Sequence, residues 1–155
     1  MSVVTGQSLR IRPAAEADLD AIERIETGAF ASDRASRRQM LHAVRSGTIL
    51  CLVAERDGAV AGYATVEFRR GARVAHLASI AIAPSAAGRG LGRELLMAVE
   101  AGSRARGCDR LRLEVRADNV AAQHLYDRSG YARIGEEDDY YEDGSSAWRY
   151  EKRLA

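Results

Sequence analysis

The sequence predicts an α/β (α+β) fold, in which a mixed, mostly antiparallel sheet of about seven strands with a central parallel pair is flanked by about four helices. Two observations indicate this fold. Residues 76–116 read as a buried strand, a glycine-rich turn, an amphipathic helix and a second strand, and such a right-handed crossover joins parallel neighbours. Elsewhere, turn signals such as Asp57-Gly58 join consecutive strands, which makes those pairs antiparallel.

The remaining elements follow from hydrophobic periodicity. Residues 9–13 alternate and end at Pro13, which is typical of an edge strand. Apolar residues at helical spacing predict a helix over 16–30 and a second helix through Met40 that ends at Ser46-Gly47. Further strands are expected at 49–56, 60–69, 131–141 and 148–154, and a further helix at 120–129.

Length and composition favour one globular domain over residues 1–155, with a buried core. The formal net charge of +1 argues against bulk electrostatic binding to nucleic acid or to an anionic membrane surface. We find neither a leader peptide nor an apolar run near the roughly 18 residues that a span needs. We therefore expect a soluble, cytoplasmic protein with no nucleic-acid or membrane partner.

The two cysteines do not indicate a disulfide framework. Cys51 and Cys108 are expected to be buried or idle thiols that lie outside the cleft predicted beside the strand at 111–116. With the three histidines, His42, His76 and His124, they give no metal-ligand spacing, so we expect no metal.

Three glycines in five residues open the central helix. Gly88, Gly90 and Gly92 allow positive φ and let a ligand come close to backbone amides. Those amides lie at a helix N-terminus, where unpaired N–H groups and the helix dipole favour an anion. The turn therefore indicates phosphate binding, although many plain turns share its spacing.

Two common phosphate motifs do not fit this turn. A dinucleotide fingerprint needs glycine at position 93, which is Arg93, and a P-loop needs G-K-[ST], whereas the single lysine is Lys152. The spacing is instead similar to the Q/R-x-x-G-x-G/A turn of the GNAT superfamily of N-acetyltransferases, which binds the pyrophosphate of acetyl-CoA. Position 87 is alanine where the superfamily has arginine or glutamine, and Arg89 or Arg93 is expected to replace that contact.

The strand at 111–116 alternates strictly between apolar and charged residues. Its apolar side points one way, while Arg112 and Glu114 point the other way. Because parallel strands are usually apolar on both faces, the charged face is either exposed or lines a cleft. From the residues alone, Glu114 is either a surface ion-pair partner or a functional carboxylate.

A second and more specific resemblance extends over about residues 76–131, and more weakly through 139–144, and its motif lies at 113–131. The chain there reads Leu113-Glu114-Val115-Arg116-Ala117-Asp118-Asn119, then Ala122, Leu125-Tyr126 and Gly130-Tyr131. This resembles the pattern L-E-V-R-x-x-N-x-x-A-x-x-L-Y-x-x-x-G-[FY] of the ribosomal-protein-alanine N-acetyltransferases, a branch of the GNAT superfamily. The resemblance implies a GNAT-type sheet and acetyl-CoA as the co-substrate, with no metal.

The resemblance also assigns roles to individual positions. It places the general base on Glu114 and the general acid on Tyr126, which could otherwise be a core tyrosine. Asn119 would contact the coenzyme as well as cap a helix. The other coenzyme-binding positions are Ile80, Ala81 and Ile82 along the strand, and Ala87, Gly88, Arg89, Gly90, Leu91, Gly92 and Arg93 in the turn.

Amine chemistry favours an N-terminal acceptor. An α-amino group has a pKa near 7.7–8 and a lysine near 10.4, so neutral lysine costs about 3–4 kcal/mol more. We therefore expect direct transfer to a protein or peptide α-amine. The alternatives are a small-molecule amine or lysine acetyltransferase, or a catalytically silent CoA-binding sensor that the alanine at 87 would suit.

Two polar segments have no role fixed by the pattern. Asp33, Arg34 and Arg37 lie where GNAT proteins often shape the acceptor site. The acidic stretch 136–143 is either a solvated hairpin tip or an attractive surface for a cationic peptide or polyamine.

Overall fold

The computed structural model describes residues 9–31 and 33–154. The strands are β1 (Leu9–Pro13), β2 (Ile49–Arg56), β3 (Ala59–Phe68), β4 (Val74–Ile82), β5 (Arg110–Arg116), β6 (Ala132–Glu137) and β7 (Ala147–Arg153). The helices are α1 (Leu19–Ala29), α2 (Arg37–Arg45), α3 (Leu91–Ala105) and α4 (Val120–Arg128), with 3-10 turns at Glu16–Asp18 and Pro84–Ala86.

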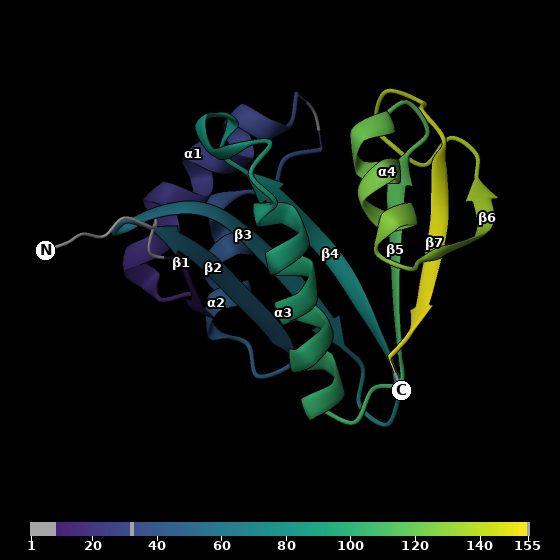
Figure 1. Ribbon diagram of the computed structural model, residues 1–155, viewed down its shortest axis with the longest axis horizontal. Coiled ribbons are helices and arrows are strands. Elements are labelled where there is room, and N and C mark those ends of the chain that lie inside the picture. The colour runs from purple at the N-terminus through teal and green to yellow at the C-terminus, as the bar shows by residue number, and fades with distance from the viewer. Residues whose placement is uncertain (1–8, 32, 155) are drawn as a thin grey trace, which may run out of the picture.

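The strands form one sheet in the order β1-β2-β3-β4-β5-β7-β6 (Figure 1). Neighbouring strands in this order are antiparallel, except that β4 and β5 are parallel, as the crossover predicts. The predicted fold class is therefore confirmed, and β1 lies at one edge of the sheet as expected.

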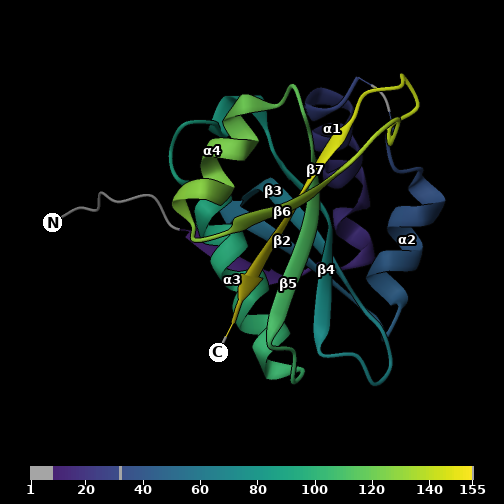
Figure 2. The ribbon, with the colours of Figure 1, turned by 90° about the vertical axis from the view of Figure 1, so that its right-hand side faces the viewer.

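Helices cover both faces of the sheet (Figure 2). On one face α3 packs over β2, β3 and β4, and its apolar stripe of Leu91, Leu95, Leu96 and Val99 is almost fully buried. On the other face α1 and α2 pack over the same strands through a second cluster that includes Ile22, Met40 and Tyr63. These three helices thus cover the central strands on both faces.

The region predicted as one helix over 16–30 starts as a 3-10 turn before α1 begins at Leu19. The buried Asp18 side chain explains this start. It accepts hydrogen bonds from the Ala15 backbone N–H at 2.7 Å and from two nitrogens of Arg12 at 2.8 and 2.9 Å. The carboxylate thereby ties the first helix to β1.

The prediction that the strand before the glycine-rich turn is buried is only partly correct for β4. Ala75, Leu77 and Ala81 are buried, but Ala78 is exposed and Ile80 is half-buried. The strand also contains a bulge, because Thr65 and Val66 of β3 pair with Ser79 and Leu77, which leaves Ala78 without a partner. This side of β4 borders a cavity rather than a packed layer.

The terminal hairpin is confirmed, with a shorter first strand than expected. β6 ends at Glu137 and β7 begins at Ala147, so most of the acidic stretch 136–143 lies in the connecting loop. Within this loop Asp139 has a φ of 57°, a left-handed conformation that aspartate tolerates better than most residues.

Candidate active site

The parallel strands β4 and β5 separate along their length and open a cleft. They pair only from Val74↔Arg110 to His76↔Arg112, whereas β4 continues to Ile82 and β5 to Arg116. Figure 1 shows the two strands diverging from this short contact. A cavity of about 590 Å³, here called the larger cavity, lies between them and is also lined by residues of α1 and α4. In α/β folds, ligands bind beyond the carboxyl ends of such strands.

Glu114 lies in the wall of the larger cavity with its side chain only 15% exposed. His76 on β4 lies with Nε2 at 2.7 Å from Glu114 Oε1, and the Tyr140 hydroxyl donates to the same oxygen at 3.3 Å. Among the described residues, none donates to Oε2. The charged face of β5 therefore lines a cleft at Glu114, which leaves one carboxylate oxygen open to a ligand.

The contact between His76 and Glu114 also shifts the pKa of both side chains. Burial favours the neutral acid, but the hydrogen bond and charge of His76, the charge of Arg149 and the Tyr140 hydrogen bond together lower the pKa of Glu114. The hydrogen bond that His76 donates to Glu114 raises the pKa of His76 against the opposing effect of burial. Glu114 is therefore ionised at neutral pH, which is the state that a general base requires.

Tyr126 on α4 lines the same cavity as Glu114. The residue is 4% exposed, and its ring lies against the rings of Tyr131 and Tyr150, with centroid distances of 5.7 and 5.8 Å. Burial raises the pKa of its phenol. The geometry is therefore compatible with both roles considered for Tyr126. Its ring is part of the core, and the residue also borders the cavity.

The glycine-rich turn has the backbone that phosphate binding requires. Gly88 and Gly90 have φ values of 80° and 78°, which other residues rarely adopt. Gly90 is the N-cap of α3 and no side chain caps this helix, so the first-turn N–H groups remain open to an anion. Ala87, Arg89 and Arg93 are exposed around the turn, whereas the Leu91 side chain is buried and offers only its backbone.

The edge of β4 beyond His76 is open toward the cavity. β3 pairs with Ile80, Ala81 and Ile82 on one side, but β5 has already diverged on the other. The free backbone groups along this edge fit an amide-containing arm such as pantetheine, which could pair as a strand does. Ile80 lines the larger cavity, whereas the Ala81 side chain belongs to the core cluster that packs under α1 and α2.

Asn119 performs the helix-capping role expected of it. Its side chain accepts a hydrogen bond from the Ala122 N–H at 3.1 Å, which caps α4. Asn119 also lines the larger cavity, so a coenzyme contact remains open to it.

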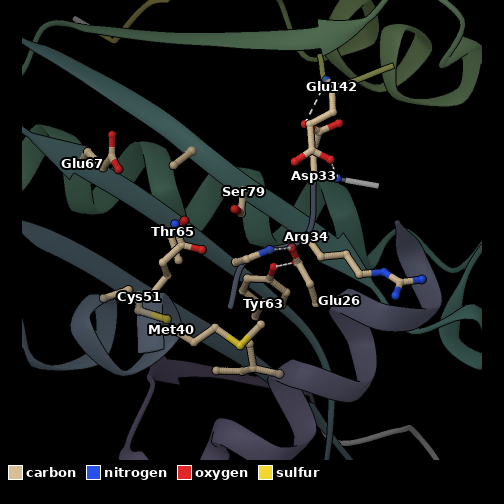
Figure 3. A pocket seen from close by; sticks show the side chains of 15 residues that line it. Glu26, Asp33, Arg34, Met40, Cys51, Tyr63, Thr65, Glu67, Ser79 and Glu142 are labelled. Carbon is tan, nitrogen blue, oxygen red and sulfur yellow. Dashed lines mark hydrogen bonds between the residues drawn. The ribbon is translucent and has the colours of Figure 1, made fainter. Parts of the chain in front are cut away.

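A second cavity of about 400 Å³, here called the smaller cavity, adjoins the first at Glu26, Asp33, Ala78 and Ser79, which line both. Figure 3 shows Tyr63 pointing at the buried Glu26, to which its hydroxyl donates. The other Glu26 oxygen accepts from the Ala35 N–H at 2.6 Å. The bulge at Ala78 therefore lies where the two cavities meet.

Cys51 lines the smaller cavity and not the larger one, so it lies outside the cleft at Glu114, as expected. Burial, with a smaller contribution from the charge of Asp18, raises the pKa of its thiol to about 12. The thiol is therefore protonated at neutral pH and is a poor nucleophile. Cys108 is buried at the junction between α3 and β5 and lines neither cavity.

The two polar segments to which the sequence assigned no role, at 33–37 and 136–143, make contacts within the fold. Arg34 donates to the Phe30 carbonyl at 2.6 Å at the end of α1, and Arg37 on α2 bonds to Asp20 of α1 at 2.7 Å. Asp33 contacts Glu142 in the β6–β7 loop. Both Asp33 and Glu142 line the smaller cavity, so part of the acidic stretch faces a cleft rather than solvent alone.

The part of the chain that the structure describes holds no cluster of three metal-ligating side chains. Within that part, no helix is long and apolar enough to cross a bilayer.

Residues 17–131 match the Acetyltransferase (GNAT) family. The chain belongs to this family. Its members use acetyl-CoA as acetyl donor, and this GNAT domain carries the residues that fit it: open amides at the start of α3 and a free edge on β4. The protein is therefore a GNAT N-acetyltransferase.

Two known proteins resemble this GNAT protein over most of its length. An uncharacterized N-acetyltransferase of Methanocaldococcus jannaschii is 35% identical over 141 residues, covering 88% of this chain and 86% of its own. The crystal structure of the ribosomal-protein-S18-alanine N-acetyltransferase of Escherichia coli superposes with a TM-score of 0.85 at 28% identity, covering 96% of this chain and 95% of that one.

A third comparison concerns the coenzyme. The YncA structure of Salmonella typhimurium, determined with its cofactor acetyl-CoA, superposes with a TM-score of 0.80. At 23% identity, over 95% of this chain and 94% of that one, the similarity concerns the fold.

Sequence reasoning missed His76 and Tyr140 as partners of Glu114 in this GNAT site, and Glu26 with Tyr63 at the junction of the cavities. The signal for His76 is the strand register. His76 pairs with Arg112, which lies on the same face of β5 as Glu114 two residues further on. Periodicity predicts that the strands are parallel but does not predict their register.

Proposed function

We propose that this N-acetyltransferase transfers acetyl directly from acetyl-CoA to the α-amine of a protein or peptide N-terminus. The observation that carries the proposal is the Glu114 carboxylate, which lines the larger cavity between the separated strands with Oε2 unbonded among the described residues. The Escherichia coli enzyme that this chain resembles is named for an N-terminal alanine acceptor, which supports the same acceptor class.

In the proposed mechanism, Glu114 accepts a proton from the attacking amine, directly or through one water. The amine nitrogen bonds to the acetyl carbon, and backbone N–H groups of the open β4 edge stabilise the charge that develops on the carbonyl oxygen. The carbon–sulfur bond then breaks, and Tyr126 supplies the proton that the leaving thiolate takes. No residue of this chain forms a covalent intermediate in this scheme.

The lowered pKa of Glu114 favours an α-amine over a lysine side chain. A weak base is sufficient when much of the acceptor is already neutral, and an α-amine of pKa 7.7–8 is at least about half neutral at pH 8. Lysine, with a pKa near 10.4, would need a stronger base or a desolvating pocket.

A second candidate acceptor is a small polycation. The carboxylates of Glu26, Asp33, Glu67 and Glu142 line the smaller cavity, and this arrangement favours an amine that carries further positive charge.

The test is release of free thiol from acetyl-CoA across four acceptor types: N-terminal peptides, lysine peptides with blocked N-termini, polyamines and aminoglycosides. The proposal predicts the highest kcat/KM with an unblocked N-terminal peptide. Highest kcat/KM with a polyamine or aminoglycoside would support the second candidate instead. Binding of acetyl-CoA without turnover on any amine would indicate a sensor and contradict the proposal.

A further inference from the structure

Three titratable side chains form a row across β3, β4 and β5. Glu67 Oε1 lies 3.4 Å from His76 Nδ1, and His76 Nε2 lies 2.7 Å from Glu114 Oε1. The register explains the row, since Glu67 pairs with His76 on the antiparallel side and His76 pairs with Arg112 on the parallel side. The imidazole thus contacts one carboxylate with each nitrogen.

The row leads from the cavity wall to solvent. The exposed fraction of the side chain increases from 15% at Glu114 to 39% at His76 and 55% at Glu67. A proton that reaches Glu114 therefore has a hydrogen-bonded route out of the cleft through the imidazole.

The acetyl-transfer reaction needs such a route, and this step of the argument rests on the proposed function. An ammonium and acetyl-CoA give an N-acetyl amide, CoA as a thiol and one proton. The carbon–nitrogen bond forms, the carbon–sulfur bond breaks, and the sulfur keeps one of the two protons that the nitrogen loses. The other proton leaves the cleft in each turnover in which the acceptor binds as an ammonium.

We propose that His76 takes this proton from Glu114 through Nε2 and releases it from Nδ1 to Glu67 and solvent. When Glu114 holds the proton, Nε2 is the acceptor and the imidazole carries its own proton on Nδ1; when Glu114 is ionised, Nε2–H donates to it. When Nε2 gains a proton and Nδ1 loses one, the ring is neutral with its proton on Nε2, and the Nδ1–H tautomer is restored by exchange with water when Glu114 is next protonated. His76 is thus a positioning and relay residue that acts through Glu114.

The proton affinities of the groups support the relay. An unperturbed glutamate has a pKa about 3–4 units below that of an α-amine, whereas imidazole is within about 1–1.5 units of it. Because two groups in contact titrate as a pair, the proton affinity of the Glu114–His76 pair exceeds that of a lone carboxylate. Contact with Glu114 raises the pKa of His76 further.

Other charged and titratable groups face the pair from neighbouring elements. Arg149 of β7 pairs with Glu114 in the sheet and favours its ionised form, and Tyr140 from the β6–β7 loop donates to it. Arg112 of β5 lies beside His76 but bonds to Glu151 at 2.5 Å. Among the described groups, Glu67 and Glu114 are therefore the hydrogen-bond partners of the imidazole.

The test compares two variants of His76 with a matched control. His76→Ala opens a space at a partly exposed position, His76→Gln keeps a hydrogen-bonding group that cannot titrate, and His124→Gln makes the same change on the exposed face of α4, outside both cavities. We expect kcat/KM to fall about 10- to 100-fold in both His76 variants and to be unchanged in His124→Gln. Acetyl-CoA affinity and thermal melts should remain close to wild type.

Chemical rescue separates a relay from a structural role. Imidazole should restore much of the lost rate to His76→Ala in proportion to its free-base concentration, whereas pyrazole, of similar size but far lower basicity, should not. Equal rescue by both, no rescue by imidazole, or wild-type kcat/KM in His76→Gln would overturn the relay while leaving acetyl transfer intact. Failure of the wild-type enzyme to turn over any amine would instead overturn the proposed function.

Discussion

Asp33 and Glu142, 109 residues apart in the sequence, each accept a hydrogen bond from the backbone N–H of the other. The distances are 3.2 Å from Glu142 N to Asp33 Oδ1 and 3.4 Å from Asp33 N to Glu142 Oε2. The two residues join the α1–α2 loop to the β6–β7 loop, and both line the smaller cavity. Arg116 on β5 supports the contact, since its guanidinium bonds to Asp143 and lies over the Tyr141 ring.

The two hydrogen bonds between Asp33 and Glu142, here called the clasp, should affect how tightly the acceptor amine binds. Asp33→Ala removes one acceptor, and losing a hydrogen bond of about 1 kcal/mol should raise the acceptor KM roughly 5-fold. Acetyl-CoA affinity should change less than 2-fold. Glu142→Ala should have a similar effect, and the double variant should lose less than the sum because the bonds form one unit. Asp109→Ala, at the opposite end of β5, is the control, and additive effects in a double-mutant cycle would contradict the clasp.

Gly90 should be essential for binding acetyl-CoA. Alanine at position 90 is strained at the φ of 78° that Gly90 adopts. If the backbone relaxes from this conformation, the N–H groups of the first turn of α3 point away from the anion. We expect acetyl-CoA affinity, measured by calorimetry, to fall at least about 10-fold. Gly58→Ala is the matched control, because Gly58 has a φ of 82° in the β2–β3 turn with nothing within 4 Å of an added Cβ. Equal loss of affinity in both variants would mean that general strain, and not the anion site, is responsible.

Tyr126→Phe tests the proposed general acid. The ring contacts with Tyr131 and Tyr150 are preserved, so the melting temperature should change little. The raised pKa of the phenol makes it a reluctant acid, and its help must come from hydrogen bonding as charge develops on sulfur. We expect kcat to fall about 10- to 1,000-fold at nearly unchanged acetyl-CoA affinity. A variant that melts much earlier but turns over normally per folded molecule would make Tyr126 a core residue only.

The ionised Asp18 should cause the free energy of unfolding to decrease at acidic pH. Its pKa is lowered chiefly by the hydrogen bond from Arg12, against the effect of burial. A carboxyl with a depressed folded-state pKa contributes stability that is fully present above its unfolded pKa of about 3.9 and is lost as pH falls through the folded value. Arg12→Gln should therefore lower the free energy of unfolding by about 1–3 kcal/mol at pH 7 and flatten its decline below pH 4.

The control for this ion pair is Arg73→Gln, which breaks the exposed pair with Asp109 and should cost less than about 0.5 kcal/mol. Urea unfolding at a series of pH values measures both variants. An unchanged acid dependence in Arg12→Gln would show that the pair is not the source.

Sequence reasoning predicted the parts of this fold that short-range patterns encode. The strand-turn-helix run identified the parallel pair β4 and β5, and the alternation of β5 placed Glu114 on its polar face. The capping role of Asn119 followed from its place before α4. Each of these features depends on residues within one element or one turn.

The features that were missed depend on long-range register. The contact between His76 and Glu114 needs the exact alignment of two strands, and the bulge at Ala78 shifts the alignment of β3 with β4. The early end of β4–β5 pairing, which opens the larger cavity, has no local signature either. Tertiary packing decides these features, so periodicity alone does not report them.

The measurement that tests the central claim most directly is kcat of Glu114→Gln with an N-terminal peptide, followed by thiol release from pH 6 to 9. The amide keeps the shape of the side chain but cannot accept the proton, so we predict a loss of about 10²- to 10⁴-fold at neutral pH. The loss should shrink as pH rises, because more of the amine is then neutral without help. Wild-type turnover by Glu114→Gln at neutral pH would contradict the assignment of Glu114 as the base.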